Sequence, residues 1–140
     1  MIDESVLLKK ISHVRHNLAR LRQKNTISTA EFKRDIDLQD IVLHNLQLAM
    51  QGCIDIGSHI IAEAGWGIAG SLNEIFYILQ DKGIIRSDLT EKMVSMVGFR
   101  NILVHEYEAV NLDIVHHIMC NRLKDIDEFL LAVVDYFKLS

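Results

Sequence analysis

The chain has 140 residues, the length of a single domain with room for a sizeable core. The absence of proline and the 6% share of aromatic residues favour long helices and argue against a sheet-rich fold. Residues 1–34 carry eight Lys/Arg against three Asp/Glu, whereas residues 35–140 carry seven Lys/Arg against sixteen Asp/Glu. The net charge of −4 argues against nucleic-acid binding by the overall charge of the chain. A local basic surface could still bind a nucleic acid.

The first predicted helix runs from about Asp3 to Lys24. Its apolar residues recur at spacings of four and three, which places them on one helical face; they are Leu7, Ile11, Val14, Leu18 and Leu21. The opposite face carries an arc of cationic and titratable side chains: Lys9, His13, His16, Arg20 and Lys24. Charges opposite an apolar seam are usually just solvated, but an arc without an acid is a candidate surface for holding RNA.

The second helical region begins with a capping box at Ser28–Glu31 and ends near Ala64. The polar run at residues 34–37 indicates a kink or a break ahead of its main part. Apolar residues between positions 41 and 60 cover a wide surface. This region therefore predicts a central helix that contacts more than one neighbour.

Two shorter segments follow. Three glycines in residues 65–70 predict a loop, because so many glycines destabilise a helix. A capping box at Ser71–Glu74 begins a helix that stops at Gly83. Ser87 or Asp88 then begins another amphipathic helix.

Asn111 caps one last helix, whose apolar seam spans residues 112–137. Together these elements predict one all-α domain over residues 1–140, a bundle of about five helices. Cys53 and Cys120 are too few for a disulfide framework or a structural zinc site. The chain has no apolar run near 18 residues and no signal-peptide pattern, so we expect a soluble, cytoplasmic protein with no membrane partner.

Arg100 stands where the preceding helix should present an apolar residue. The stripe around it is formed by Leu89, Met93, Met96, Val97, Leu103 and Val104. A charge on such a face is costly unless it is paired or meets solvent or a ligand at an interface. His105 lies five positions on, which a continued helix would rotate by roughly 140° from Arg100. Either the helix ends near His105 and the chain bends back, or the two side chains serve different faces, or a second subunit brings them together.

Arg100, Asn101 and His105 are candidates for a site that acts on a phosphodiester or another anion. Guanidinium binds phosphate oxygens in bidentate fashion, and imidazole can move the proton that attack by a ribose 2′-hydroxyl requires. Asn101 could position the phosphate or the hydroxyl. The alternative is an arginine paired with an acid and a histidine that caps a helix end. Tyr107, between two glutamates, is either a target for modification or a ring packed at the helix end.

Asp55 and His59 are spaced four residues apart on the second helix, so they can form a hydrogen bond across one turn. Such a pair can support a site, although it is more often structural. The histidines do not predict a metal site, because His13 and His16 have no acidic or cysteine ligand within a turn. The chain also lacks a glycine-rich phosphate loop, and we predict neither a metal nor a cofactor.

The run from Arg100 to Tyr107 reads Arg-x-x-x-x-His-x-Tyr and resembles the signature of the HepT-like branch of the HEPN superfamily, small all-α ribonucleases of prokaryotic toxin–antitoxin pairs. The placement of this motif late in a five-helix chain, with a tyrosine two residues after the histidine, makes the match more specific than the bare spacing. The likeness covers nearly the whole chain and includes residues 37–40, 53–60, 96–101 and 111–115.

The resemblance implies a two-fold homodimer in which the motif-bearing segments meet at a cleft and form a composite active site. In that site Arg100 would bind the scissile phosphate of RNA, His105 would transfer protons, and Asn101 would orient these two side chains. Cleavage would need no metal, and DNA would not be a partner. Tyr107 matches the tyrosine that a cognate minimal nucleotidyltransferase antitoxin AMPylates. An AMP group there would place negative charge and bulk beside Arg100 and so neutralise the toxin.

These features leave functions of different classes open. The leading hypothesis is a metal-independent endoribonuclease toxin of a type II/VII-like toxin–antitoxin pair. The alternative is a non-catalytic helical adaptor that binds a nucleotidyltransferase and presents Tyr107 to it. A plain dimerisation module is a third hypothesis, and only the position of Arg100 argues against it. RNA cleavage that requires both Arg100 and His105 would discriminate among the three.

Overall fold

The computed structural model describes residues 2–139, without the side chain of Tyr107. Within these residues the chain forms α-helices and one short 3₁₀ helix but no strand, which confirms the predicted all-α class. None of the described helices combines the length and the apolar character needed to cross a bilayer. In chain order the elements are α1 (Glu4–Arg22), α2 (Thr29–Arg34), α3 (Ile36–Ala64), α4 (Leu72–Asp81), α5 (Ser87–His105), η1 (Tyr107–Ala109), α6 (Leu112–Asn121) and α7 (Leu123–Phe137).

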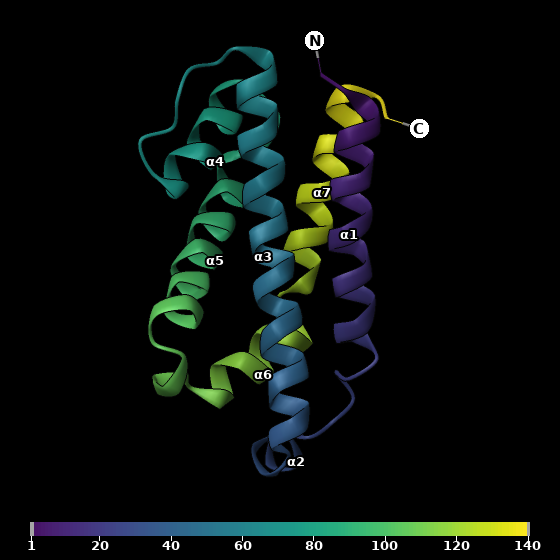
Figure 1. Ribbon diagram of the computed structural model, residues 1–140, viewed down its shortest axis with the longest axis vertical. Coiled ribbons are helices and arrows are strands. Elements are labelled where there is room, and N and C mark those ends of the chain that lie inside the picture. Colours follow the sequence, from purple (N-terminus) through teal and green to yellow (C-terminus); the bar gives the residue numbers. More distant parts are fainter. Residues whose placement is uncertain (1, 140) are drawn as a thin grey trace.

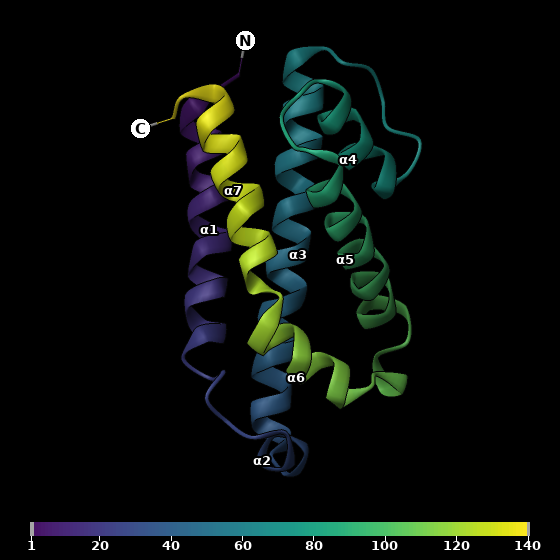
Figure 2. The ribbon, with the colours of Figure 1, turned by 180° about the vertical axis from the view of Figure 1, so that it is seen from behind.

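The long helix α3 runs through the centre of the molecule, as its wide apolar surface predicts (Figure 1). Helices α1 and α7 lie on one side of it, and α4 and α5 follow one another on the other side (Figure 1). Both termini lie at the same end, whereas α2 and α6 lie at the opposite end (Figures 1 and 2). Because α3 buries side chains around most of its circumference, it separates α1 from α5.

The helix starts that the sequence indicates are confirmed by their caps. The side chains of Ser28, Ser71 and Asn111 each accept a hydrogen bond from a backbone N–H two or three residues later. Asp35 separates α2 from α3 and caps α3 in the same way, so the break expected within residues 34–37 is present. Local polar residues therefore set most of the helix starts.

Two of the expected helices differ in detail from the structure. Helix α1 ends at Arg22 rather than at Lys24. The last predicted helix is in fact two helices, α6 and α7, which meet at an angle at Arg122 (Figure 2). The Asn121 side chain donates to the backbone oxygen of His117 at 3.1 Å and competes with the helical ladder, so α6 ends there. With α2 and α3 also separate, the described chain has seven α-helices rather than about five.

Both cysteines are free thiols, and no disulfide links them. Cys53 is buried in the core and Cys120 is half-buried. Burial raises the pKa of each thiol above its ordinary value, which keeps both neutral at physiological pH. Neutral, shielded thiols are poor nucleophiles, and this agrees with the packing role that the sequence predicts.

Helix α1 packs closely along α3 because Gly52 leaves room for it. A Cβ atom at Gly52 would overlap Cγ2 of Val14, which is itself buried. We expect Gly52→Ala to lower the free energy of unfolding by about 1–2 kcal/mol, because the cost of overpacking exceeds the gain in helix propensity. Urea denaturation measures this change. In a Val14→Ala background the cost should shrink, since the opposing methyl group is gone, and an equal cost in both backgrounds would contradict the explanation.

Candidate active site

Arg100 lies on the side of α5 that faces α3, as its place in the apolar stripe predicts, and it is half-buried. Its Nη2 donates to Gln51 Oε1 at 2.7 Å and its Nη1 donates to Asn101 Oδ1 at 3.0 Å. Its Nε is buried and has no hydrogen-bond partner in the described structure. Both observed partners are neutral amides, so the alternative of an arginine paired with an acid is not seen among residues 2–139. The guanidinium keeps an uncompensated charge that suits an anion.

Gln51 holds Arg100 in place and is itself held by an acid. The Gln51 Nε2 donates to Asp55 Oδ1 at 2.9 Å, which turns Gln51 Oε1 toward the guanidinium. A chain of hydrogen bonds therefore runs from Asp55 on α3 through Gln51 and Arg100 to Asn101 on α5. Sequence reasoning missed Gln51, because a glutamine on a long helix carries no signal of its own. The one available hint was Asp55, a single turn further along.

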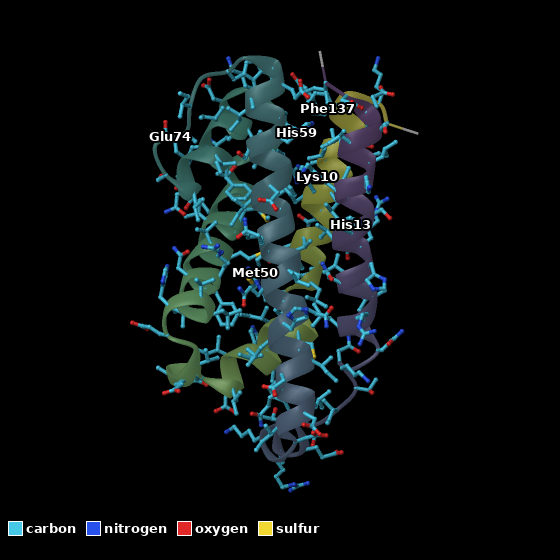
Figure 3. The ribbon with its side chains drawn as sticks, viewed as in Figure 1. Lys10, His13, Met50, His59, Glu74 and Phe137 are labelled. Carbon is cyan, nitrogen blue, oxygen red and sulfur yellow. The ribbon has the colours of Figure 1, made fainter. Side chains whose placement is uncertain are left out.

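The structure pairs Asp55 and His59 with other residues and not with each other. Asp55 accepts from Gln51, whereas His59 Nε2 lies 3.7 Å from Glu63 Oε1. Helical side chains lean toward the N-terminus, which brings Asp55 onto Gln51. His59 lies further along α3, toward the end of that helix away from α2 (Figure 3). Asp55 thus reaches Arg100 through Gln51, and His59 is not part of this chain of hydrogen bonds.

His105 is the last residue of α5 and is exposed. Because α5 stays helical up to this residue, its side chain lies about 140° around the axis from Arg100. Within one chain the two side chains therefore serve different faces. Ile102 and Val104 beside His105 are apolar but 42% and 39% exposed. The backbone of Tyr107 begins η1, but its side chain lies outside the described part of the structure.

The basic arc predicted on α1 is not brought to Arg100. Most of its members are exposed on α1, and Lys24 lies in the turn beyond the end of that helix, half-buried. Helix α1 carries His13 on the opposite side of α3 from α5 (Figure 3). Within one chain the guanidinium of Arg100 is therefore separate from the arc formed by Lys9, His13, His16, Arg20 and Lys24.

Comparison with known proteins identifies relatives over nearly the whole chain. The family model described as Ribonuclease HepT-like matches residues 14–133. The mRNA nuclease HepT of Shewanella oneidensis is 36% identical over 125 residues, which cover 89% of this chain and 93% of that protein. The tRNA nuclease HepT of Aphanizomenon flos-aquae is 27% identical over 110 residues, which cover 79% of this chain and 75% of that protein.

A solved structure is similar over an even larger share of the chain. The tri-AMPylated HEPN toxin of Shewanella oneidensis in complex with MNT antitoxin gives a TM-score of 0.85 at 35% identity, and the match covers 96% of this chain and 99% of that chain. Family, sequence and fold agree with the resemblance that the motif from Arg100 to Tyr107 indicates. The chain therefore belongs to the HepT-like ribonuclease family of the HEPN superfamily.

Proposed function

We propose that this protein is a metal-independent endoribonuclease toxin of a toxin–antitoxin pair, which cuts RNA with Arg100 and His105 brought together across a two-fold dimer. A minimal nucleotidyltransferase antitoxin would neutralise it by AMPylating Tyr107. Relatives that are an mRNA nuclease and a tRNA nuclease support the activity, and the AMPylated toxin bound to an MNT antitoxin supports the partner and the modification. The observation that carries the proposal is the half-buried guanidinium of Arg100, whose two hydrogen-bond partners among the described residues are both amides.

The chemistry follows from the two side chains. Arg100 has five N–H donors, and two of them are engaged by Gln51 and Asn101, so others remain for the oxygens of a scissile phosphate. The imidazole of His105 takes the proton of the ribose 2′-hydroxyl as the 2′-oxygen bonds to phosphorus. The bond from phosphorus to the 5′-oxygen breaks, and that oxygen takes up a proton as it leaves. DNA lacks the 2′-hydroxyl, so RNA is the expected substrate.

The dimer is proposed because one chain keeps Arg100 and His105 apart. The face of α5 that carries His105 also exposes Ile102 and Gly98. Apart from its own helix, a Cβ atom at Gly98 would meet no described atom of this chain within 4 Å, so the packing of the described residues does not require a glycine there. Close approach of a second α5 would require it, and burial of the exposed apolar side chains would favour that contact. The partner subunit's His105 could then reach Arg100.

The direct test of the proposed function is cleavage of total RNA in the presence of EDTA by purified protein shown by intact mass to carry no AMP. Arg100→Ala should lower the cleavage rate by roughly 10²-fold or more, because the charge that stabilises the transferring phosphoryl group is lost. Arg100→Lys should be intermediate, since lysine keeps the charge but not the bidentate geometry. If AMP-free wild-type protein leaves RNA intact, the nuclease proposal fails and the adaptor takes its place.

Gln51 offers a second prediction at the same site. Gln51→Glu has nearly the same shape but puts a carboxylate against Arg100, which would form an ion pair and repel phosphate. We expect the KM for RNA to rise by about tenfold or more, the scale of a lost hydrogen bond to a charged group. The matched control is Gln47→Glu, one turn earlier on α3 and also half-buried. An equal effect of both substitutions on KM would show that Gln51 has no special role.

A further inference from the structure

A cavity of about 190 Å³ lies between α3, α5, α6 and α7. Its apolar wall is formed by Met50, Met96, Phe99 and Ile118, and its polar wall by Lys92, Ser95, His117, Arg122 and Asp125. Met50 on α3 and Phe99 on α5 directly precede Gln51 and Arg100 in the sequence (Figure 3 labels Met50). The cavity and the candidate active site are therefore formed by neighbouring residues of the same two helices, α3 and α5.

Asp125 is the most unusual group in this cavity. Its side chain is 1% exposed, and its Oδ2 forms an ion pair with Arg122 Nη2 at 3.0 Å. Its Oδ1 is buried without a hydrogen-bond partner in the described structure, and the Nζ of Lys92 lies 3.9 Å away. A buried acceptor left unpaired is costly, so native structures usually provide a partner for it. Asp125 is one of the residues that line the cavity, so a ligand placed there would lie beside this carboxylate.

The rest of the cavity limits what such a ligand can be. A volume of about 190 Å³ is below the roughly 300–1,000 Å³ of pockets for drug-sized molecules, so it suits one ring system. Phe99 provides an aromatic face for stacking, and the side chains of Lys92 and Arg122 are 34% and 40% exposed and can meet phosphates outside. An unpaired nucleobase meets these requirements, because it is a planar ring with N–H donors that is attached to the anionic backbone of a strand.

We propose that this cavity binds one unpaired base of the RNA, next to the phosphate held by Arg100, with Asp125 Oδ1 accepting from a ring or exocyclic N–H. The inference rests on the proposed function and adds a source of base preference to it. Carboxylates read base edges in this way in known nucleic-acid complexes. Phe99 and Arg100 are consecutive residues about 100° apart around α5, so one strand that places a base in the cavity can place a neighbouring phosphate at Arg100.

The first readout is binding of the four nucleoside 5′-monophosphates to AMP-free protein by calorimetric titration. Ser95→Trp fills the cavity from an exposed position, and Asp125→Asn removes the charge that strengthens the hydrogen bond. Each substitution should lower the affinity for the tightest-binding of the four nucleotides by about tenfold or more. Ser87→Trp adds the same bulk to an exposed position of α5 that does not line the cavity and should leave affinity unchanged. Asp125→Asn removes a buried ion pair and can unfold the chain. The affinity of Ser95→Trp therefore decides whether the cavity is the binding site.

The second readout is the distribution of cut sites in RNA, which Ser95→Trp should change and Ser87→Trp should not. The nucleotide titration needs no cleavage, so the cavity can be tested even if the protein cuts no RNA. Binding should also persist in Arg100→Ala, which lacks the phosphate ligand of the active site. The proposal is overturned if none of the four nucleotides binds, if binding is lost in Arg100→Ala but kept in Ser95→Trp, or if Ser95→Trp cuts RNA at the same sites as the wild type.

Discussion

His105→Ala is expected to lower the rate of RNA cleavage by about 10²–10⁴-fold, the usual contribution of a positioned general acid or base. His105 ends α5 and is exposed, so its truncation removes no buried contact and should change stability by less than about 0.5 kcal/mol. Single-turnover cleavage of total RNA by AMP-free protein measures the first effect, and urea denaturation measures the second. Loss of cleavage with unchanged stability assigns His105 to the chemistry rather than to the fold.

The matched control for this change is His44→Ala, which truncates an exposed histidine on a different helix, α3. It should leave the cleavage rate close to that of the wild type. A His105→Ala protein that cuts RNA within about threefold of the wild-type rate would remove His105 from proton transfer. In that case Arg100 would act alone by electrostatic stabilisation, and the motif would have to be reinterpreted.

Incubation with a minimal nucleotidyltransferase antitoxin and ATP is expected to abolish cleavage by the wild-type protein while leaving Tyr107→Phe active. The reason is the position of Tyr107, two residues after His105, where an added AMP brings negative charge and bulk to the residues that must receive RNA. Phenylalanine lacks the phenolic oxygen that accepts the AMP group. Intact mass before and after incubation, followed by cleavage of total RNA, measures both parts of the prediction.

Tyr136→Phe is the control for this experiment, because Tyr136 is a 43% exposed tyrosine on α7, away from the motif. This variant should gain AMP and lose activity like the wild type. If Tyr107→Phe still gains AMP, or if it is silenced equally without gaining AMP, then Tyr107 is not the switch. Silencing without a mass change would instead indicate inhibition by binding of the antitoxin alone.

The features that depend only on residues close together in the sequence, such as helix caps, were predicted correctly. Ser28, Ser71 and Asn111 begin helices because each side chain satisfies a nearby backbone N–H, and such a signal needs no knowledge of the tertiary structure. The position of Arg100 within an apolar stripe follows from helical periodicity alone. The break at Arg122 was missed because the apolar seam continues across it. Competition by the Asn121 side chain is visible only in the structure.

Contacts between helices were beyond sequence reasoning. Gln51 meets Arg100 because α3 and α5 place them side by side, although they are separated by 49 residues in sequence. Asp125 is buried in α7, and its Oδ1 lies 3.9 Å from the Nζ of Lys92 on α5, a contact that depends on how these two helices pack. Asp55 was selected for a pairing with His59, but its actual partner lies one turn in the other direction. Spacing on a helix gives two candidate neighbours, and only packing decides between them.

A site shared between two protomers can be tested with mixed dimers of Arg100→Ala and His105→Ala chains, purified with two different affinity tags. Each chain lacks one half of the motif, so a site built within one chain stays incomplete in the mixed dimer. A site built across two chains retains one complete pair, formed by Arg100 of one protomer and His105 of its partner. We predict that the mixed dimer recovers a large part of wild-type RNA cleavage while each variant alone remains inactive. A mixed dimer as inactive as its two parents would contradict a composite site.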